Sequence, residues 1–397
     1  MNDDPERRRR WRLVLGRPDE DEGAAGPGDP LGAALEGLDA SRDATLEALY
    51  GASADRKGGL GRSSPRVARW LGDIRTFFPT GVVQVMQRDA MERLGLRELL
   101  LEPELLDTVQ PDVHLVGTLL ALNKALPERS REPARALVRK VVDDLERRLA
   151  QPTRQAVSGA LNRAARTRRP RPPDIDWNRT ILANLRHYQP EHGTVIPERL
   201  VGYGRRLPEV SREIVLCIDQ SGSMATSVVY AGVFAAVLAS IRTVRTRVVA
   251  FDTSVVDLSD HLHDPVELLF GVQLGGGTDI DGALAYCETV VTRPRDTVLV
   301  LISDLYEGGD WESTLARARA FVEGGVQMVA LLALSDEGAP GYSHEHAAAL
   351  ASLGIPAFAC TPDLFPELMA AAIQRRDLSE WAAAAAATEP RGPSTAG

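Results

Sequence analysis

The sequence predicts an α/β protein, in which a C-terminal doubly wound, mostly parallel sheet is preceded by an all-helical N-terminal domain. Beyond Ser211, runs of branched aliphatic residues alternate with helical segments, and this is typical of strands buried on both faces of a parallel sheet. Between residues 65 and 168, apolar residues instead recur only at helical spacing. Aromatic residues make up only 5% of the chain and alanine is abundant, which favours helices packed on aliphatic strands.

Size and charge narrow the function classes. The 397 residues are 44% hydrophobic, enough for two or three domains. Lys and Arg number 46 against 55 Asp and Glu, a net charge of −9, which argues against binding to nucleic-acid phosphates over the whole surface. Three widely spaced cysteines in apolar segments, Cys217, Cys287 and Cys360, indicate neither a disulfide framework nor a C-x-x-C pair. We therefore expect buried thiols in a reducing, cytoplasmic compartment.

Membrane and export signals are weak. We find no run of about 18 apolar residues and expect no spanning helix and no membrane partner. The arginines at 7–10 have the charge of a signal-peptide start, but the apolar stretch after them ends within three residues and acidic residues follow at 19–22.

The N-terminal half divides into three predicted parts. Residues 1–60 are rich in Gly, Pro, Asp and Glu, and we expect them to be poorly ordered or weakly helical. Residues 61–168 form the helical domain, with the clearest helix at 132–149 and its mixed charges on a solvated face. Residues 169–212 are a Pro/Arg-rich linker and extended arm, since closely spaced prolines end the helix. The basic run could contact RNA or an acidic partner, although a solvated linker is the simpler interpretation.

The spacing of apolar residues predicts the elements of the C-terminal domain, residues 213–376. Each strand is a short apolar run, and each helix has apolar residues at helical spacing. An Ala-rich tail at 377–397 should fray. Strands are predicted at 213–219, 247–252, 255–258, 297–303, 326–334 and 356–360, and helices at 227–244, 264–270, 280–291, 311–323, 344–353 and 363–376.

Three polar segments lie at the carboxyl ends of predicted strands or in the loops beside them. The first is 219–224, Asp-Gln-Ser-Gly-Ser-Met. The second is the glycine-rich 274–280, with Thr278 just before a helix, and the third is 303–309, which contains Asp304. Ligands of open α/β sheets bind beyond the carboxyl ends of the strands, so we expect these segments to form one site.

Asp219-x-Ser221-x-Ser223, followed later by Thr278 and Asp304, resembles the metal-ion-dependent adhesion site of von Willebrand factor type A (VWA) domains. All five family positions are filled, and the resemblance covers about residues 213–376. It implies that Ser221 and Ser223 coordinate a divalent ion directly, Thr278 directly or through water, and the two aspartates largely through water.

Simple coordination chemistry agrees with the resemblance. Two hydroxyls at positions i and i+2 of a sharp turn can point the same way, and a small hard cation prefers oxygen ligands. Both Mg²⁺ and Mn²⁺ fit, and an ion with few direct protein charges would accept a partner's carboxylate.

Taken alone, each of the three segments could have a structural role instead of binding a metal ion. Ser221 and Ser223 could cap a helix, Asp219 could simply end a strand, and the glycines could form a turn. We assign structural roles to Asp252 and Asp279, the latter as a helix cap. Glu307 either rims the site or is a solvated loop residue.

Catalytic motifs fit poorly. Ser221 stands where a haloacid-dehalogenase-type phosphotransferase needs its second aspartate, and the Asp-Thr-Ser at 252–254 lacks the glycine of aspartic proteases. Neither a Walker motif nor a Gly-x-Ser-x-Gly elbow is present, and the seven histidines lack zinc spacing. A metal-dependent hydrolase or phosphotransferase would have to use Glu307, Asp252 or Asp279 as its general base.

The helical half followed by a VWA domain is similar to bacterial CoxE-like and ViaA-like proteins. That resemblance implies a non-enzymatic co-chaperone or adaptor of a MoxR-type AAA+ ATPase, which remodels client proteins or loads them with metal. The expected partner is the ATPase or a client, bound through an acidic side chain.

Overall fold

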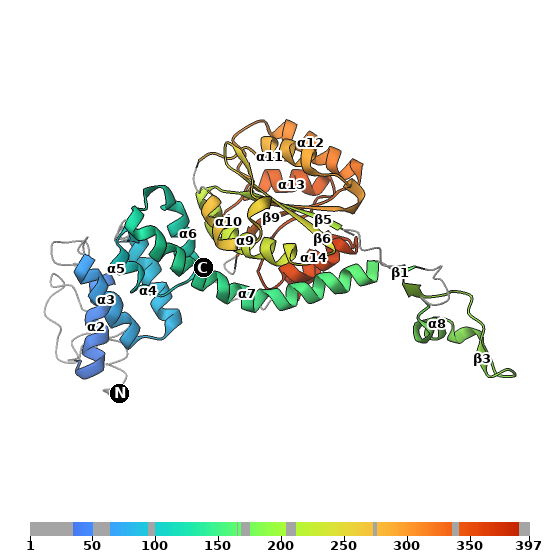
Figure 1. The fold of residues 1–397 in the computed structure, drawn as a ribbon, viewed down its shortest axis with the longest axis horizontal. Coiled ribbons are helices and arrows are strands. Elements are labelled where there is room, and N and C mark those ends of the chain that lie inside the picture. Colours follow the sequence, from blue (N-terminus) through green and yellow to red (C-terminus); the bar gives the residue numbers. More distant parts are fainter. Residues whose placement is uncertain are drawn as a thin grey trace, which may run out of the picture. The chain divides into compact units, whose positions relative to one another are not determined.

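The computed structural model describes residues 35–50, 64–93, 100–164, 166–167, 175–203, 212–272, 276–335 and 341–388. Its contacts divide the chain into two compact units, Met1–Val141 and Val142–Gly397, which are described separately (Figure 1).

The N-terminal unit is helical throughout its described part, as the periodicity predicts. The apolar stripe of its second described helix, at positions 67, 70, 71 and 74, is buried, and the indole of Trp70 donates a hydrogen bond to the Thr45 carbonyl 3.0 Å away in the preceding helix. Asp112 caps a later helix by accepting a 2.6 Å bond from the Leu115 amide. The helices are α2 (Gly37–Tyr50), α3 (Ser64–Phe77), α4 (Thr80–Arg93), α5 (Pro103–Leu106), α6 (Val113–Ala121) and the 3-10 turn η4 (Asn123–Ala125).

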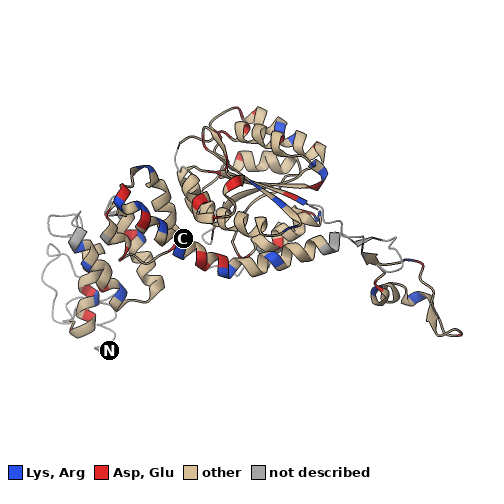
Figure 2. Ribbon diagram, viewed as in Figure 1, with Lys and Arg blue, Asp and Glu red and all other residues tan. Residues whose placement is uncertain are grey.

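The long helix α7 (Glu128–Ala164) crosses the division between the units and exceeds the predicted 132–149. Pro152 would ordinarily end a helix here because it lacks an amide hydrogen. The helix continues, and in this turn the buried Thr153 hydroxyl donates to the Leu149 carbonyl at 2.7 Å. Val157 and Ala160 extend the buried stripe, while acidic and basic residues interleave along the helix (Figure 2).

Residues 175–203 differ from the extended arm that the sequence predicts. The Asp176 side chain accepts a 3.1 Å bond from the Arg179 amide and starts a short helix. Aspartate is a common helix-capping residue, but the nearby prolines favour an extended chain. The elements are α8 (Trp177–Ala183), η6 (Leu185–His187), a hairpin of β2 (Tyr188–Gln189) with β3 (Thr194–Val195), and β4 (Gly202–Tyr203), which pairs antiparallel with β1 (Arg166–Thr167).

A six-stranded sheet follows, in the order β10-β9-β8-β5-β6-β7. All neighbours are parallel except β7, which runs antiparallel to β6. This confirms the doubly wound, mostly parallel fold. Central strand β5 is buried from Glu213 to Asp219. The strands are β5 (Arg212–Asp219), β6 (Val244–Phe251), β7 (Val255–Asp257), β8 (Thr297–Ile302), β9 (Gln327–Leu334) and β10 (Ala357–Cys360).

Helices cover both faces of the sheet (Figure 1). On one face, α11, α12 and α13 enclose a core that includes Cys217, Leu284 and Phe321. On the other face, α9 and α14 meet at Phe234 and Phe365, whose ring centroids are 4.2 Å apart. The helices are α9 (Ala225–Ala239), α10 (Pro265–Gly271), α11 (Ile280–Val290), α12 (Trp311–Gly324), α13 (His344–Ser352), α14 (Phe365–Ile373) and α15 (Leu378–Thr388), with 3-10 turns η7 (Gly222–Met224), η8 (Ser259–His261) and η9 (Pro294–Asp296).

Two segments depart from expectation. Gly222–Ala239 is long and apolar enough, by length and composition, to cross a membrane, and 67% of it is buried in the structure. It comprises η7 and α9, and its apolar character follows from its place in the core. The Ala-rich tail is helical at α15 as far as the structure describes it, with Leu378 and Trp381 buried, so packing holds this part of a segment predicted to fray. Residues 389–397, and most of 1–60, lie outside the described residues.

Candidate metal centre

The first candidate loop leaves the carboxyl end of β5 at Asp219. The Asp219 carboxylate accepts a 2.8 Å bond from the Ser221 amide, which folds the chain into the turn that carries η7. In this turn the Ser221 and Ser223 hydroxyl oxygens lie 3.2 Å apart. The i and i+2 spacing therefore brings the two hydroxyls together, as the sequence predicts.

The third candidate loop leaves the neighbouring strand β8 and meets the first. The Ser223 hydroxyl donates to the Asp304 carboxylate at 2.6 Å, and the Ser303 hydroxyl donates to the Asp219 carboxylate at 2.7 Å. Because β5 and β8 pair in parallel, their carboxyl ends lie side by side. Asp219, Ser221, Ser223 and Asp304 thus form one connected oxygen cluster.

Two backbone features hold Asp304 in place. Leu305, the next residue, has a positive φ of 61°, an uncommon conformation for a non-glycine residue. The Leu305 amide donates to the Ser303 hydroxyl at 3.0 Å, and its carbonyl lies 2.8 Å from Nδ1 of His346 in α13. Hydrogen bonds at both the amide and the carbonyl of Leu305 therefore hold this strained turn.

Thr278 lies in the second loop, beside the third. Its carbonyl accepts a 2.9 Å bond from the Gly308 amide, and a Cβ at Gly308 would lie only 3.0 Å from that oxygen, so glycine permits the close approach. Within the described residues, no hydrogen bond joins the Thr278 hydroxyl to the other four predicted ligands. The backbone of Thr278 therefore joins the second loop to the third loop at Gly308.

Asp252 and Asp279 have structural roles, as expected. Asp279 caps α11 by accepting a 2.8 Å bond from the Gly282 amide. The Asp252 carboxylate accepts from the amide and hydroxyl of Ser254 at 2.7 and 2.8 Å, and its carbonyl accepts from the Asp279 amide at 2.8 Å. Both carboxylates organise the loops around the oxygen cluster.

Glu307 and Ser303 have roles that the sequence alone did not assign. The two carboxylate oxygens of Glu307 accept from the Ile280 and Gly309 amides, each at 2.9 Å, so Glu307 joins the second loop to the third. Burial raises the pKa of Glu307 above its ordinary value. Ser303, fully buried, was visible only as a hydroxyl beside Asp304 at the end of an apolar strand.

The two acidic groups of the cluster are removed from water, with Asp219 0% and Asp304 5% exposed. Burial raises the pKa of Asp219, and the like charge of Asp304 adds to this, whereas hydrogen bonds from Ser221 and Ser303 oppose it. In the part of the chain that is described, no three His, Cys, Asp or Glu side chains gather as a metal site. The donor set is instead hydroxyl and carboxylate oxygen, which suits Mg²⁺ or Mn²⁺ rather than zinc.

A family model described as VWA domain containing CoxE-like protein matches residues 145–369, more than half of the chain. The chain belongs to this family. The match confirms the resemblance drawn from the motif residues, and it begins within α7, upstream of the sheet.

A relative in Escherichia coli (strain K12), the uncharacterized protein YehP, is 36% identical over 364 residues, covering 89% of this chain and 93% of YehP. The relationship therefore includes the N-terminal helical half. Among solved structures, an aerotolerance-related membrane protein from Bacteroides fragilis aligns with 12% identity and a TM-score of 0.31, over 41% of this chain and 99% of that one. BatB from Bacteroides thetaiotaomicron aligns with 15% identity and a TM-score of 0.32, over 43% and 99%. These two similarities are too low to support a functional inference.

Proposed function

We propose that this VWA protein is a non-enzymatic, metal-dependent interaction protein of the cytoplasm. Asp219, Ser221, Ser223, Thr278 and Asp304 would hold Mg²⁺, or alternatively Mn²⁺. The ion, when bound, would supply a Lewis-acidic position for a carboxylate of a partner protein. The observation that carries the proposal is the oxygen cluster formed where the first and third loops meet, with Ser223 bonded to Asp304 at 2.6 Å.

The rest of the chain fits a binding role for the cluster. The three carboxylates that a hydrolase could use as a general base, Asp252, Asp279 and Glu307, already accept hydrogen bonds from loop or helix amides. The hydroxyls of Ser221 and Ser223 lie on exposed or half-buried residues, where a partner can approach.

The identity of the partner rests on the family. CoxE-like and ViaA-like proteins, which this chain resembles, imply a MoxR-type AAA+ ATPase that hydrolyses ATP while the VWA protein acts as adaptor or co-chaperone in client remodelling or metal loading. The ATPase or its client would present an Asp or Glu to the ion.

Metal binding is measured first, without a partner. Titration of Mn²⁺ followed by electron paramagnetic resonance should show one bound ion in the wild type, competed by Mg²⁺. The ion should be lost in Asp219→Ala and in the Ser221→Ala, Ser223→Ala double variant. Asp260→Ala, a change at an exposed residue of η8, is the matched control and should bind as the wild type does.

The partner is then captured from cell extract by wild type, Asp219→Ala and Asp260→Ala, each in Mg²⁺ and in EDTA. An AAA+ ATPase or client should be retained only by the wild type and Asp260→Ala, and only in Mg²⁺. Retention that survives both EDTA and Asp219→Ala would contradict the proposal, and so would turnover of phosphate esters that Asp304→Ala abolishes.

A further inference from the structure

The loops at the two ends of the six-stranded sheet carry opposite charges. Because β5, β6, β8 and β9 are parallel, their carboxyl ends lie together at one edge of the sheet and their amino ends at the other. The candidate metal centre lies at the carboxyl ends. The loops there are here called the acidic edge, and those at the amino ends are called the basic edge.

The acidic edge holds ten Asp and Glu residues and no Lys or Arg, a net charge of −10. Some of these carboxylates act inside the domain, such as Asp281, which pairs with Arg317 at 2.7 Å. Four others are exposed, and no ion pair with a described residue neutralises them: Asp310, Glu312, Glu345 and Asp363. The segments that form this edge are 219–224, 252–254, 276–281, 303–313, 341–346 and 361–364.

The basic edge holds eight arginines against four acidic residues, a net charge of +4. Of these acids, Glu213 is only 2% exposed, and Asp296 pairs with both Arg212 and Arg293, at 2.6 and 3.0 Å. Three exposed arginines make no side-chain hydrogen bond or ion pair within the described ranges: Arg242, Arg295 and Arg376. The segments that form this edge are 212–213, 240–247, 291–297, 323–327 and 373–377.

Bonds to the backbone hold the parts of the basic edge together. The Arg375 guanidinium donates to the carbonyls of Arg295 and Gly325, and the Gln327 side chain donates to the Arg376 carbonyl at 3.4 Å. These bonds attach the end of α14 to the starts of β8 and β9. Neighbouring strands lie about 4.8 Å apart, so the amino ends of four strands give a surface about 15 Å across.

Helix dipoles account for only part of this separation of charge. Acidic residues stabilise the first turn of a helix and basic residues the last turn, and Asp310 caps α12 in this way. The effect is confined to the terminal turn, whereas Arg242 lies three residues past α9, Arg295 five past α11 and Arg376 three past α14. The charges of these arginines can therefore act on a molecule outside the domain.

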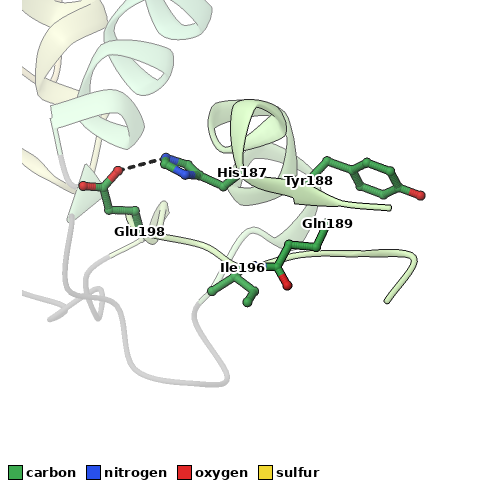
Figure 3. Close-up of a pocket in the computed structure, with 5 residues that line it drawn as sticks. All are labelled: His187, Tyr188, Gln189, Ile196 and Glu198. Carbon is green, nitrogen blue, oxygen red and sulfur yellow. Dashed lines mark ion pairs between the residues drawn. The ribbon is translucent and has the colours of Figure 1, made fainter. Parts of the chain in front are cut away.

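Residues 175–203 have no such excess of charge. Their three arginines are matched by three acidic residues. Glu198 pairs with Arg186 at 3.0 Å and with His187 at 2.9 Å, beside an open hollow at the hairpin of β2 and β3 (Figure 3). The two edges of the sheet differ from this region because neighbouring side chains do not balance their charge.

We propose that copies of this chain associate head to tail, with the basic edge of one VWA domain against the acidic edge of the next. The three unpaired arginines of one copy would face the four unpaired carboxylates of the other. A second copy is the partner that the charges favour, because the same molecule carries both complementary surfaces. Each contact leaves one edge of each kind open, so the assembly is a ring if the rotation closes and a filament if it does not. The neighbour would cover the candidate metal centre, but the contact itself needs no metal.

Sedimentation velocity of the full chain in EDTA measures this association. The weight-average sedimentation coefficient should rise with protein concentration at about 50 mM salt and stay constant at about 500 mM salt, because salt screens exposed charges. Reversal of the basic edge in Arg242→Glu, Arg376→Glu should raise the dissociation constant about tenfold or more. Reversal within the acidic edge in Glu312→Arg, Glu345→Arg should have the same effect.

A mixture of the two double variants separates the head-to-tail contact from a general effect of charge. Each variant alone lacks one intact edge, but the mixture pairs the intact acidic edge of the first with the intact basic edge of the second. An equimolar mixture should therefore associate again and stop at pairs. Arg66→Glu, Arg69→Glu, at exposed residues of α3, makes the same change in net charge as the basic-edge variant and is the matched control. It should associate as the wild type does. Because all the altered positions are exposed, circular dichroism should show unaltered folding.

Four results would overturn the proposal. These are wild-type sedimentation that does not depend on concentration at the lower salt, association that neither double variant weakens, and a mixture of the two variants that stays monomeric. The fourth is binding of a single-stranded RNA that is tighter than self-association and is lost in the basic-edge variant, which would assign the basic edge to nucleic acid.

Discussion

At the scale of single residues, the candidate centre depends on serine hydroxyls that each make two hydrogen bonds, one of them to a carboxylate. Ser223 contacts both Ser221 and Asp304, and Ser303 contacts both Asp219 and the Leu305 amide. A buried carboxylate is costly unless it is hydrogen-bonded or paired. The serines therefore keep two aspartates close together at a sheet edge, in a set of oxygens that a divalent cation could complete.

Asp257 gives a prediction about acid stability at a site away from the cluster. Burial alone would raise the pKa of Asp257, but hydrogen bonds from Ser259 and from the Tyr286 hydroxyl, at 2.9 Å, together with Arg247, lower it overall. Because its pKa is lower in the folded than in the unfolded state, Asp257 stabilises the fold above the unfolded pKa, about 3.9. That stability is lost as the pH falls through the lower folded pKa.

Asp257→Asn should therefore destabilise the protein at pH 7 and reduce the difference in stability between pH 7 and pH 3. Urea unfolding across this range measures both effects. Asp260→Asn, at an exposed residue of η8, is the matched control and should change neither quantity. A pH dependence identical to that of the wild type would show that Asp257 contributes nothing to acid stability.

At the scale of elements, the order of strands and helices was predictable because period and burial agree. The apolar runs at β5, β8 and β9 are buried on both faces, and Asp219 and Asp304 follow β5 and β8, so their meeting could be inferred from topology. The role of Glu307 could not, because its partners are backbone amides of another loop. The extent of α7 could not be predicted because Pro152 suggests a break, whereas the helix continues through it. The short helix α8 could not be predicted because it lies between proline-rich segments, whose composition predicts an extended chain.

Glu307 leads to a prediction about the loops. Each of its carboxylate oxygens accepts one amide, Ile280 at the start of α11 or Gly309, so Glu307→Gln would turn one acceptor into an NH₂ group facing a donor. The second and third loops should loosen relative to each other. Since partners behind metal ligands typically contribute about 10–100-fold to metal affinity, Mn²⁺ should bind about tenfold more weakly.

The same variant should show faster hydrogen exchange at 278–282 and 305–309. Glu312→Gln, on the exposed first turn of α12, is the matched control and should alter neither quantity. If Glu307→Gln loosens the loops without weakening Mn²⁺, the second loop does not contribute to the metal centre. If neither changes, the bridge has no energetic role.

At the scale of the C-terminal unit, the first metal loop continues directly into a core helix that touches the last sheet-covering helix. η7 leads into α9, where Phe234 packs against Phe365 at the start of α14. The other end of α14 is attached to β5 through Arg212, which donates to the Ile373 carbonyl at 3.4 Å, and the chain then turns at Arg375 with φ of 55°. Packed interiors transmit displacements because they are dense, so a shift of the Ser221–Ser223 turn should reach α14 through α9.

Partner binding in Mg²⁺ should therefore change the hydrogen exchange of α14 (Phe365–Ile373), while α6 in the N-terminal unit serves as the internal reference. Phe234→Leu keeps an apolar side chain but removes the ring contact, and it should reduce the change in α14 without abolishing metal binding. A matched substitution on the opposite face, Phe321→Leu, should leave the change intact. Exchange in α14 that stays the same on partner binding would show that the site acts locally, as a docking point without mechanical coupling to the rest of the sheet.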